Sequence, residues 1–314
     1  MQRLADIGEN AVVARLRRLL PSAPAVATGI GDDCAVVRVR RGCANDLLLT
    51  SDPVIAGVHF APDTPPERIG HKAIGRVLSD IAAMGGQPLW ALINLVAPPR
   101  TPVRLLERIY QGARRLADRF GMVIVGGDTA AGAQLALHVF GVGRVPHGTA
   151  VLRSGARTGD RIYVSGTLGG SGAGKHLGFC PRVAEGQWLR AGGWVTAMMD
   201  LSDGLATDLP RMIGASGVGA RLETARIPIA PAARRVPGRL TPLQHALGDG
   251  EDFELLFTVP ARRARALEVA WRRRFRLRCT AIGVITGRSG RVELVRSDGV
   301  IAPLEQQGYE HFTA

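Results

Sequence analysis

The sequence predicts a two-domain protein of the α/β (α+β) class. Its 314 residues leave room for two domains of ordinary size, and 46% of them are apolar, enough to build a real core. Strand-like and helix-like patterns alternate through both halves of the chain. A stretch at residues 146–160, rich in Gly, Arg and turn formers, separates the halves. We therefore expect domains at residues 1–148 and 149–314.

The first half contains one helix with clear boundary signals. Thr64-Pro65-Pro66-Glu67 has the pattern of a capping box with Pro at the first helical position. The helix is expected to run to about Met84 and to be closed by two glycines. The other elements predicted here are helices at 9–20 and 102–120, strands at 35–39, 47–50, 89–96 and 135–145, and a buried strand at 122–125.

The second half repeats the alternation of strands and helices. The predicted strands are 161–164, 197–199, 220–223, 254–259, 281–285 and 291–295, and the predicted helices are 170–177, 204–213 and 261–273. Leu78-Ser79-Asp80 in the first half is echoed by Leu201-Ser202-Asp203 in the second. This echo indicates two related halves that face one site.

Six short motifs carry acidic residues without any Lys or Arg, although the chain has a formal net charge of +13. They are Gly29–Asp33, Ser51-Asp52-Pro53, Leu78–Asp80, Gly126–Thr129, Asp200–Gly204 and Gly248–Asp252. Carboxylates in turns with no cationic neighbour in sequence indicate another source of positive charge. Mg²⁺ is the simplest one, because it takes oxygen ligands and shares them with substrate phosphates. The pattern therefore favours nucleotide-phosphate chemistry.

Several motifs are difficult to explain as turns alone. Asp32 and Asp33 are adjacent carboxylates that repel unless a cation or several N–H donors lie between them, although a turn bonded to its own backbone is the alternative. Asp80 borders an apolar helical face and needs a partner, either a metal or an Arg from elsewhere. Asp128 follows two glycines that allow a ligand to approach the backbone closely.

Other motifs have stronger structural alternatives. Ser51-Asp52 ends a strand, where α/β proteins place site residues, but Pro53 could equally open an ordinary turn. Asp200 and Asp203 flank a helix start, where one carboxylate could be an N-cap, though not both. Asp249-Gly250-Glu251-Asp252 holds more acids than turn chemistry requires. Taken together, the six motifs predict one metal-binding constellation.

Two patterns could suggest other functions. Residues 169–176 nearly match a P-loop, but His176 stands where the Mg²⁺-binding hydroxyl belongs, so we interpret the segment as a flexible glycine turn leading into a helix. The Arg-rich run 271–278 could bind nucleic acid; we interpret it as the solvated end of a helix, because no nucleic-acid-binding motif accompanies it. We expect no nucleic-acid partner.

The sequence also indicates a cytoplasmic protein. No apolar run reaches the ~18 residues that span a bilayer, and the N-terminus lacks a signal peptide's apolar stretch. The four cysteines are scattered and form neither a CxxC pair nor a disulfide pattern. We expect reduced thiols and no membrane partner.

The order of the motifs closely resembles that of the thiamine-monophosphate kinase family, over nearly the whole chain. The motifs that carry the resemblance are GIGDDCAVV (29–37), SDPVIAGVHF (51–60), LSDIAAMG (78–85), GGDT (126–129), RSGARTGD (153–160), DLSDGLATDL (200–209), GEDFEL (250–255) and GYEHF (308–312). Single motifs also occur across the superfamily of aminoimidazole ribonucleotide synthetase, which is the main alternative. The sequence departs from the family pattern at Pro53 and Val77.

The resemblance implies a fold like that of aminoimidazole ribonucleotide synthetase, with an N-terminal ATP- and metal-binding domain that dimerises through its sheet and a C-terminal α/β domain. It implies ATP-dependent phosphorylation of thiamine monophosphate to thiamine diphosphate with several Mg²⁺ ions, by a homodimer. The matching metal positions are Asp33, Thr50, Ser51, Asp52, Asp80, Asp128, Asp200 and Asp203. The matching ATP contacts are Gly127, Asp128, Arg153 and Ser202, and the substrate contacts are His59, Glu251 and Tyr309.

No general base is expected, because the acceptor is a phosphate oxygen that is already anionic at neutral pH. The difficulty is to bring two polyanions together, which Mg²⁺ held by Asp clusters would allow. Arg153 could add a two-pronged phosphate contact, and Tyr309 could stack on a substrate ring. We therefore expect direct in-line transfer without a phosphoenzyme.

Overall fold

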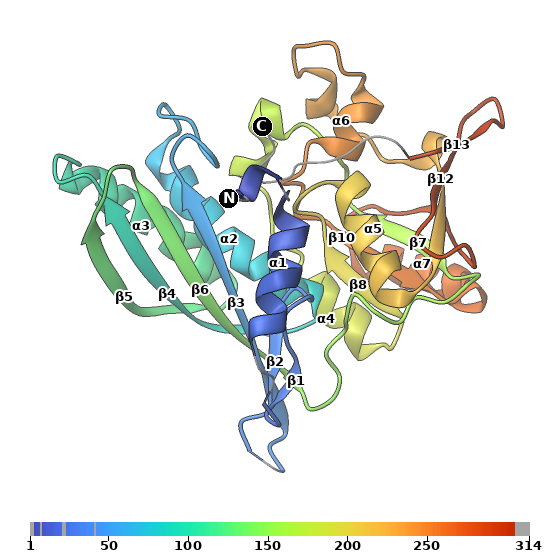
Figure 1. Cartoon of the computed structure of the whole chain (residues 1–314), viewed down its shortest axis with the longest axis horizontal. Helices are drawn as coiled ribbons and strands as arrows, with labels where there is room; N and C mark the ends of the chain where they lie inside the picture. Colours follow the sequence, from blue (N-terminus) through green and yellow to red (C-terminus); the bar gives the residue numbers. More distant parts are fainter. Residues whose placement is uncertain (1–2, 7, 21–22, 41, 305–314) are drawn as a thin grey trace.

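The computed structural model describes residues 3–6, 8–20, 23–40 and 42–304, and Figure 1 shows two β-sheets side by side with helices between and around them. The first sheet contains β1 (Val26–Thr28), β2 (Ala35–Val37), β3 (Asn45–Ile55), β4 (Gln87–Ala97), β5 (Val123–Ala131) and β6 (Ala136–Pro146). Their spatial order is β1-β2-β3-β6-β4-β5, and β4 and β5 are its parallel pair.

The second sheet has seven strands in the order β13-β12-β9-β11-β7-β10-β8. They are β7 (Arg161–Ser165), β8 (Ala197–Asp200), β9 (Gly219–Glu223), β10 (Leu255–Val259), β11 (Cys279–Thr286), β12 (Val292–Val295) and β13 (Ile301–Pro303). Central strands β7 and β10 are mostly buried, as their apolar runs predict.

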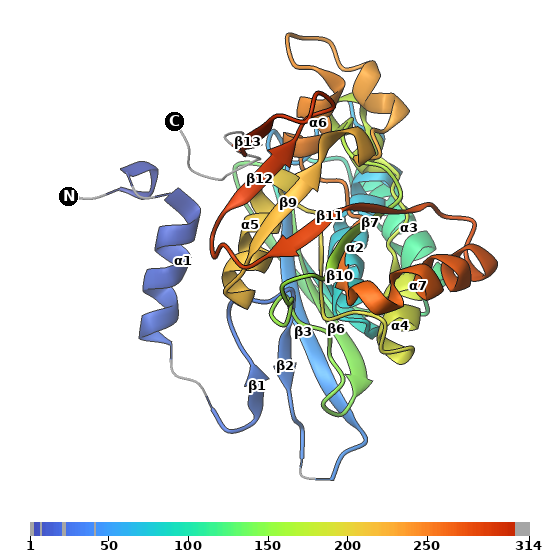
Figure 2. The same cartoon turned by 90° about the vertical axis from the view of Figure 1, so that its right-hand side faces the viewer.

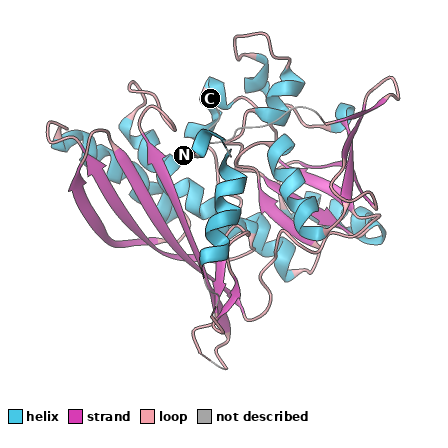
Figure 3. Ribbon diagram, viewed as in Figure 1, coloured by secondary structure: helices cyan, strands magenta, loops and turns pink. Residues whose placement is uncertain are grey.

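The α-helices are α1 (Gly8–Leu19), α2 (Pro66–Ala83), α3 (Val103–Arg119), α4 (Val183–Ala191), α5 (Leu205–Ser216), α6 (Pro242–Gly248) and α7 (Ala261–Arg274). Figure 3 shows helices between and around the two sheets. Short 3₁₀ segments occur at Leu4–Asp6, Ser171–Ala173, Lys175–Leu177, Thr224–Arg226 and Pro231–Arg234. Figure 2 shows α1 at one side of the molecule, next to α5, and residues of both helices line the same cavity. No helix within the described ranges is long and apolar enough to cross a bilayer.

Helix α2 joins the two halves. It packs against β3, β6 and α3 of the first half and also contacts β8 and α4 of the second. Ile74, Val77, Leu78 and Ile81 are completely buried in the first core, which fixes the rotation of the helix. The polar face that remains therefore lies at the junction between the sheets.

The N-terminus of α2 differs from its prediction. Pro at the first helical position is correct, but Pro65 is the N-cap residue and no side chain caps the helix, so the capping box was wrong. Thr64 lies one residue too early for its hydroxyl to reach the first turn, and its side chain is buried.

Two strands extend through residues that were expected in turns. β3 continues past Thr50 to Ile55, because all eleven of its residues pair with β6, so Ser51 and Asp52 lie within a strand. Pro53 has no N–H to donate. The pairing of β2 with β3 stops at Leu49, so β2 does not require a hydrogen bond from Pro53.

The strand predicted at 122–125 is present as β5, but the prediction that it is buried was wrong. β5 is an edge strand whose residues are almost all exposed, and it runs on through Gly127 and Asp128 to Ala131. A run of apolar residues does not distinguish a core strand from an edge strand that exposes an apolar surface.

The helix predicted at 170–177 is replaced by two 3₁₀ turns. Gly169, Gly170 and Gly174 have positive φ angles of 83°, 94° and 82°, which an α-helix does not accommodate. The segment is therefore not a P-loop leading into a helix. Sequence patterns also did not predict α4, α6, β1 or β13.

The packing of α2 against α3 gives a first test of the fold. A Cβ at Gly112 would lie 2.1 Å from the carbonyl oxygen of Glu67, so Gly112→Ala forces the helices apart and should cost about 1–3 kcal/mol of unfolding free energy. Gly214 in α5 has open space around its Cβ position, and Gly214→Ala should stabilise by about 0.5–1 kcal/mol through helix propensity. Urea unfolding of both variants measures the difference; equal effects would contradict the close helix packing.

Candidate active site

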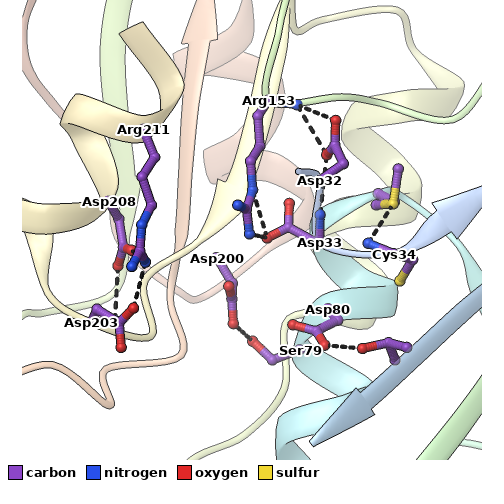
Figure 4. Close-up of polar contacts among 12 residues, drawn as sticks. Asp32, Asp33, Cys34, Ser79, Asp80, Arg153, Asp200, Asp203, Asp208 and Arg211 are labelled. Carbon is purple, nitrogen blue, oxygen red and sulfur yellow. Dashed lines mark hydrogen bonds and ion pairs between the residues drawn. The ribbon is translucent and has the colours of Figure 1, made fainter. Parts of the chain in front are cut away.

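Three carboxylates converge where the two halves meet. Asp33 lies in the turn before β2, Asp80 on α2 and Asp200 at the end of β8, and one oxygen from each lies within 4.8 Å of the others. Figure 4 shows the three side chains facing one small space. Motifs separated by up to 167 positions, from residue 33 to residue 200, are thus brought together by the packing of α2 against β8.

Hydroxyl groups orient two of these carboxylates. Thr50 in β3 donates a hydrogen bond to Asp80, and Ser79 Oγ donates to Asp200 Oδ2 over 2.5 Å. Ser79 and Asp80 are adjacent on α2, so the helix fixes Asp80 itself and, through Ser79, the carboxylate of the second half. Both orienting hydroxyls therefore come from the first half of the chain.

Without a cation, burial and mutual repulsion disfavour the charged forms of these carboxylates. Burial raises the pKa of Asp80 well above its usual range, and the charges of Asp52, Asp200 and Asp33 raise it further. Burial, followed by the charge of Asp33, raises the pKa of Asp200 to about 7. Among the described residues, Asp33 Oδ2 is buried without a hydrogen-bond partner. A hard cation bound between these oxygens would satisfy that atom and remove the repulsion.

Several carboxylates of the acidic motifs have cationic partners that lie outside the motifs in sequence. Arg153 Nη2 lies 2.7 Å from Asp33 Oδ1, and Arg76 Nη2 lies 2.8 Å from Asp52 Oδ1. Pairs that the sequence also did not reveal are Asp203 with Arg211, Asp252 with Lys175, and Glu251 with Lys72. Most of these partners are far from the carboxylate in sequence. Arg211 is closer, because it lies on α5, the helix that follows Asp203. Within the described ranges, neither Asp80 nor Asp200 has an ion pair.

A cavity of about 660 Å³ opens onto the carboxylates. It is lined by Asp32, Asp33, Thr50, Ser51, Asp52, Arg76, Asp80, Arg153, Asp200, Ser202, Asp203 and Phe253, among others. Carboxylates thus line the cavity together with three arginines, Arg76, Arg153 and Arg211. This combination suits a polyanion that arrives with cations.

Asp203 lies beside the cluster rather than in it. Figure 4 shows its carboxylate turned to Arg211, and its backbone N–H donates to Asp208 Oδ2 over 3.0 Å. The N-cap of α5 is Gly204, without a capping side chain, so the N-cap alternative for the acidic residues does not hold.

Gly127 and Asp128 are distant from the cluster within one chain. Asp128 pairs with Asn94 of β4, which pairs with His138 of β6, which in turn pairs with Pro53 of β3. At strand spacings of ~4.8 Å this register separates β5 from β3 by about 14 Å. Two ligands of one metal ion do not lie that far apart.

A second polar cluster borders the cavity and includes two of the predicted substrate residues. Lys72 Nζ, on a fully buried side chain, lies 2.5 Å from the backbone oxygen of His59 and 2.5 Å from Glu251 Oε1. Burial lowers the pKa of Lys72 to about 8, against the opposing charge of Glu251. Arg76 Nη1 also reaches Glu251 Oε1, at 3.5 Å.

Tyr309, the third predicted substrate residue, lies outside the described residues.

Sequence reasoning missed Lys72 and Arg76, although a signal was present. Arg76 lies four residues before Asp80 on α2, and Lys72 lies four residues before Arg76. This spacing places all three on one helical face. Lys72 is also one of only two lysines in the chain.

Comparison with known proteins shows two family matches and full-length relatives. Residues 31–145 match the N-terminal domain of AIR synthase related proteins, and residues 180–295 match their C-terminal domain. The thiamine-monophosphate kinase of Salmonella typhimurium is 36% identical over 97% of this chain and 98% of its own length. That of Aquifex aeolicus is 32% identical over 99% and 100%.

Solved structures show the same relationship. The structure of AaThiL complexed with AMPPCP and TMP superposes with a TM-score of 0.83, at 32% identity, covering 99% of both chains. The thiamine-monophosphate kinase from Stenotrophomonas maltophilia superposes with a TM-score of 0.73 at 34% identity, covering 92% of this chain and 95% of that one. The hydrogenase maturation protein HypE in complex with ATP, at 20% identity and a TM-score of 0.70, shares the fold.

Proposed function

This chain belongs to the thiamine-monophosphate kinases within the AIR synthase related family, and we propose that it transfers the γ-phosphoryl group of ATP to thiamine monophosphate, giving thiamine diphosphate. The observation that carries the proposal is the convergence of Asp33, Asp80 and Asp200 from two halves of the molecule onto one cavity. The proposed domains are residues 1–148, for ATP, metal and dimerisation, and residues 149–314.

Mg²⁺ is the cation that suits this site. The donors are carboxylate and hydroxyl oxygens, and the buried Oδ2 of Asp33 needs a partner. Asp33, Asp80 and Asp200 would hold metal directly, with Thr50, Ser51, Asp52 and Asp203 beside them at the cavity wall. Bound Mg²⁺ would neutralise phosphate charge and align the donor with the acceptor.

Two groups of side chains meet at Arg76: the cavity lining forms a donor side, and the Lys72 cluster next to it forms an acceptor side. Arg153 and Ser202 line the carboxylate pocket and would contact the nucleotide. Glu251 and the backbone of His59 meet at Lys72 and would contact thiamine monophosphate. Arg76 reaches both Asp52 and Glu251, which places a fixed positive charge between the two sides. The acceptor oxygen needs no base, so positioning and charge are the protein's contributions to an in-line transfer.

Homodimerisation through the first sheet would explain the position of Asp128. The outer face of that sheet exposes Trp90, Leu92, Val125 and Phe140, an apolar surface next to the unpaired edge of β5. A second copy packed on this face would carry its own Asp128 and Gly127 toward the first copy's nucleotide site.

We assign the reaction to the cytoplasm, where ATP is available.

Mixed dimers test this arrangement. Asp128→Asn should lower turnover about 100-fold, or about 2.7 kcal/mol, with the fold intact. When Asp128→Asn and Asp80→Asn chains are co-expressed with different tags, random pairing should restore about a quarter of parental activity, because one site of each mixed dimer is then intact. No recovery would contradict a contribution from the second copy.

The activity itself is tested by incubating the full chain with Mg-ATP and thiamine monophosphate and separating the products. Thiamine diphosphate and ADP should appear in equal amounts, with thiamine as a poor acceptor because it lacks the phosphate. Turnover of ATP only with an aminoimidazole ribonucleotide precursor would favour the synthetase alternative.

A further inference from the structure

The glycine-rich segment that resembles a P-loop ends in residues that bridge the two halves of the molecule beside the acceptor side. Lys175 Nζ lies 2.6 Å from Asp252 Oδ1 and also donates to the carbonyl oxygen of Thr167. Lys175 is therefore committed to the protein's own groups and does not act as a phosphate-binding lysine. Its ion pair fixes the segment to the loop that carries Glu251.

That loop has an unusual backbone. Glu251 and Phe253 have φ angles of 52° and 51°, in the left-handed region that non-glycine residues rarely adopt. Such residues persist only where their surroundings hold them, and they concentrate at functional sites. The N–H of Glu251 donates to Ser202 O over 2.6 Å, and that of Phe253 donates to Leu201 O over 2.8 Å.

The segment packs on the same loop and on α2. The ring of Phe179 stacks on Phe253 with centroids 4.1 Å apart, and the carbonyl oxygen of Phe179 lies 2.7 Å from His71 Nε2. A Cβ at Gly75 would lie 2.5 Å from the Phe179 ring, so α2 is shaped to receive it. The segment is thus wedged between the helix and the strained loop.

His176 is the residue of this segment that reaches the acceptor side. Its Nδ1 lies 2.6 Å from Lys72 Nζ and 3.0 Å from Glu251 Oε2. An ammonium group has three N–H donors, and Lys72 has three acceptors within reach, namely His59 O, Glu251 Oε1 and His176 Nδ1. As an acceptor, His176 Nδ1 carries no proton to donate to Glu251, so it acts on Glu251 through Lys72. Removing His176 would leave a buried Lys72 donor unpaired.

We propose that His176 is a positioning residue for the acceptor: it holds Lys72, and through the Lys72–Glu251 ion pair it holds Glu251, in the arrangement that binds thiamine monophosphate. This inference rests on the proposed function and deepens it. The glycine-rich segment then serves substrate affinity rather than nucleotide binding. Its effect should fall on the acceptor and leave ATP binding unchanged, because its contacts are with Lys72, Glu251 and the 251–253 loop rather than with Arg153 or the Asp33 cluster.

The test compares three variants of the full chain with the parent. His176→Ala should raise the KM for thiamine monophosphate about 10- to 100-fold, the effect of losing a hydrogen bond to a charged group, while the KM for ATP and kcat stay within about twofold. His176→Asn retains an acceptor near the Nδ1 position and should recover most of the loss. His147→Ala is the matched control: His147 Nδ1 also contacts a carboxylate, that of Asp46 at 2.8 Å, but Asp46 does not belong to the Lys72–Glu251 cluster.

Binding measurements separate the possible results. Calorimetry should show weaker binding of thiamine monophosphate to His176→Ala and unchanged binding of a non-hydrolysable ATP analogue. Equal losses for both ligands together with a lowered Tm, and no recovery in the Asn variant, would show a merely structural residue and overturn the inference. Parental acceptor affinity in His176→Ala would also overturn it. A parent chain that forms no thiamine diphosphate would instead contradict the proposed function.

Discussion

Replacing Asp80 by Asn is expected to lower kcat at least about 1000-fold, or about 4 kcal/mol of transition-state stabilisation, while making the metal-free protein more stable. Asp80 is central to the cluster: it faces Asp33 and Asp200, it accepts from Thr50, and within the described ranges it has no ion pair. Its raised pKa shows that burial and the neighbouring carboxylates disfavour its charge. Asn keeps the size and removes that charge.

A higher stability of Asp80→Asn would show that its loss of activity does not come from a disrupted fold. The Tm of metal-free Asp80→Asn should exceed that of the metal-free parent by about 2 °C or more, since each kcal/mol corresponds to a few degrees at this size. Asp118→Asn is the control, because Asp118 is an exposed carboxylate paired with Arg114 on α3. An Asp80→Asn protein that is folded and retains parental turnover would exclude Asp80 from the metal site.

Removing divalent cations is expected to abolish activity completely and reversibly. The carboxylates of Asp33, Asp80 and Asp200 share one small space, so two polyanionic substrates would meet concentrated negative charge there without a cation. Excess chelator should stop formation of thiamine diphosphate, and Mg²⁺ should restore it.

A stability measurement gives an independent readout of the same site. Under the proposed function Mg²⁺ would bind the folded cluster and not the unfolded chain, so it should raise the Tm of the parent in a concentration-dependent way and should have a smaller effect on Asp80→Asn. Full activity in excess chelator, or the same Mg²⁺ shift in both proteins, would contradict a metal site at these residues.

Much of the architecture follows from local sequence signals. The apolar periodicity of α2, its Pro at the first helical position and the glycines after it defined the helix that organises the site. Strand patterns identified most of both sheets. Errors arose where glycines with positive φ replaced a helix at residues 170–177, and where β3 and β5 continued through acidic residues that resembled turns.

The site was predictable in composition but not in geometry. Asp33, Asp80 and Asp200 were identified from their motifs, whereas the arginines that pair with Asp33 and Asp52 depend on packing between distant segments. Lys72 and His176 are 104 positions apart and meet only because the glycine-rich segment docks on α2. The position of Asp128 depends on strand order, which no local pattern specifies.

Anomalous diffraction from crystals grown with Mn²⁺ and a non-hydrolysable ATP analogue is the most direct test of this account. Mn²⁺ replaces Mg²⁺ at oxygen sites and is located by its anomalous signal. We expect a peak within about 2.2 Å of carboxylate oxygens of Asp33, Asp80 and Asp200, next to the analogue's phosphates. Phosphates bound elsewhere, or an ordered analogue with no Mn²⁺ at these three carboxylates, would contradict it.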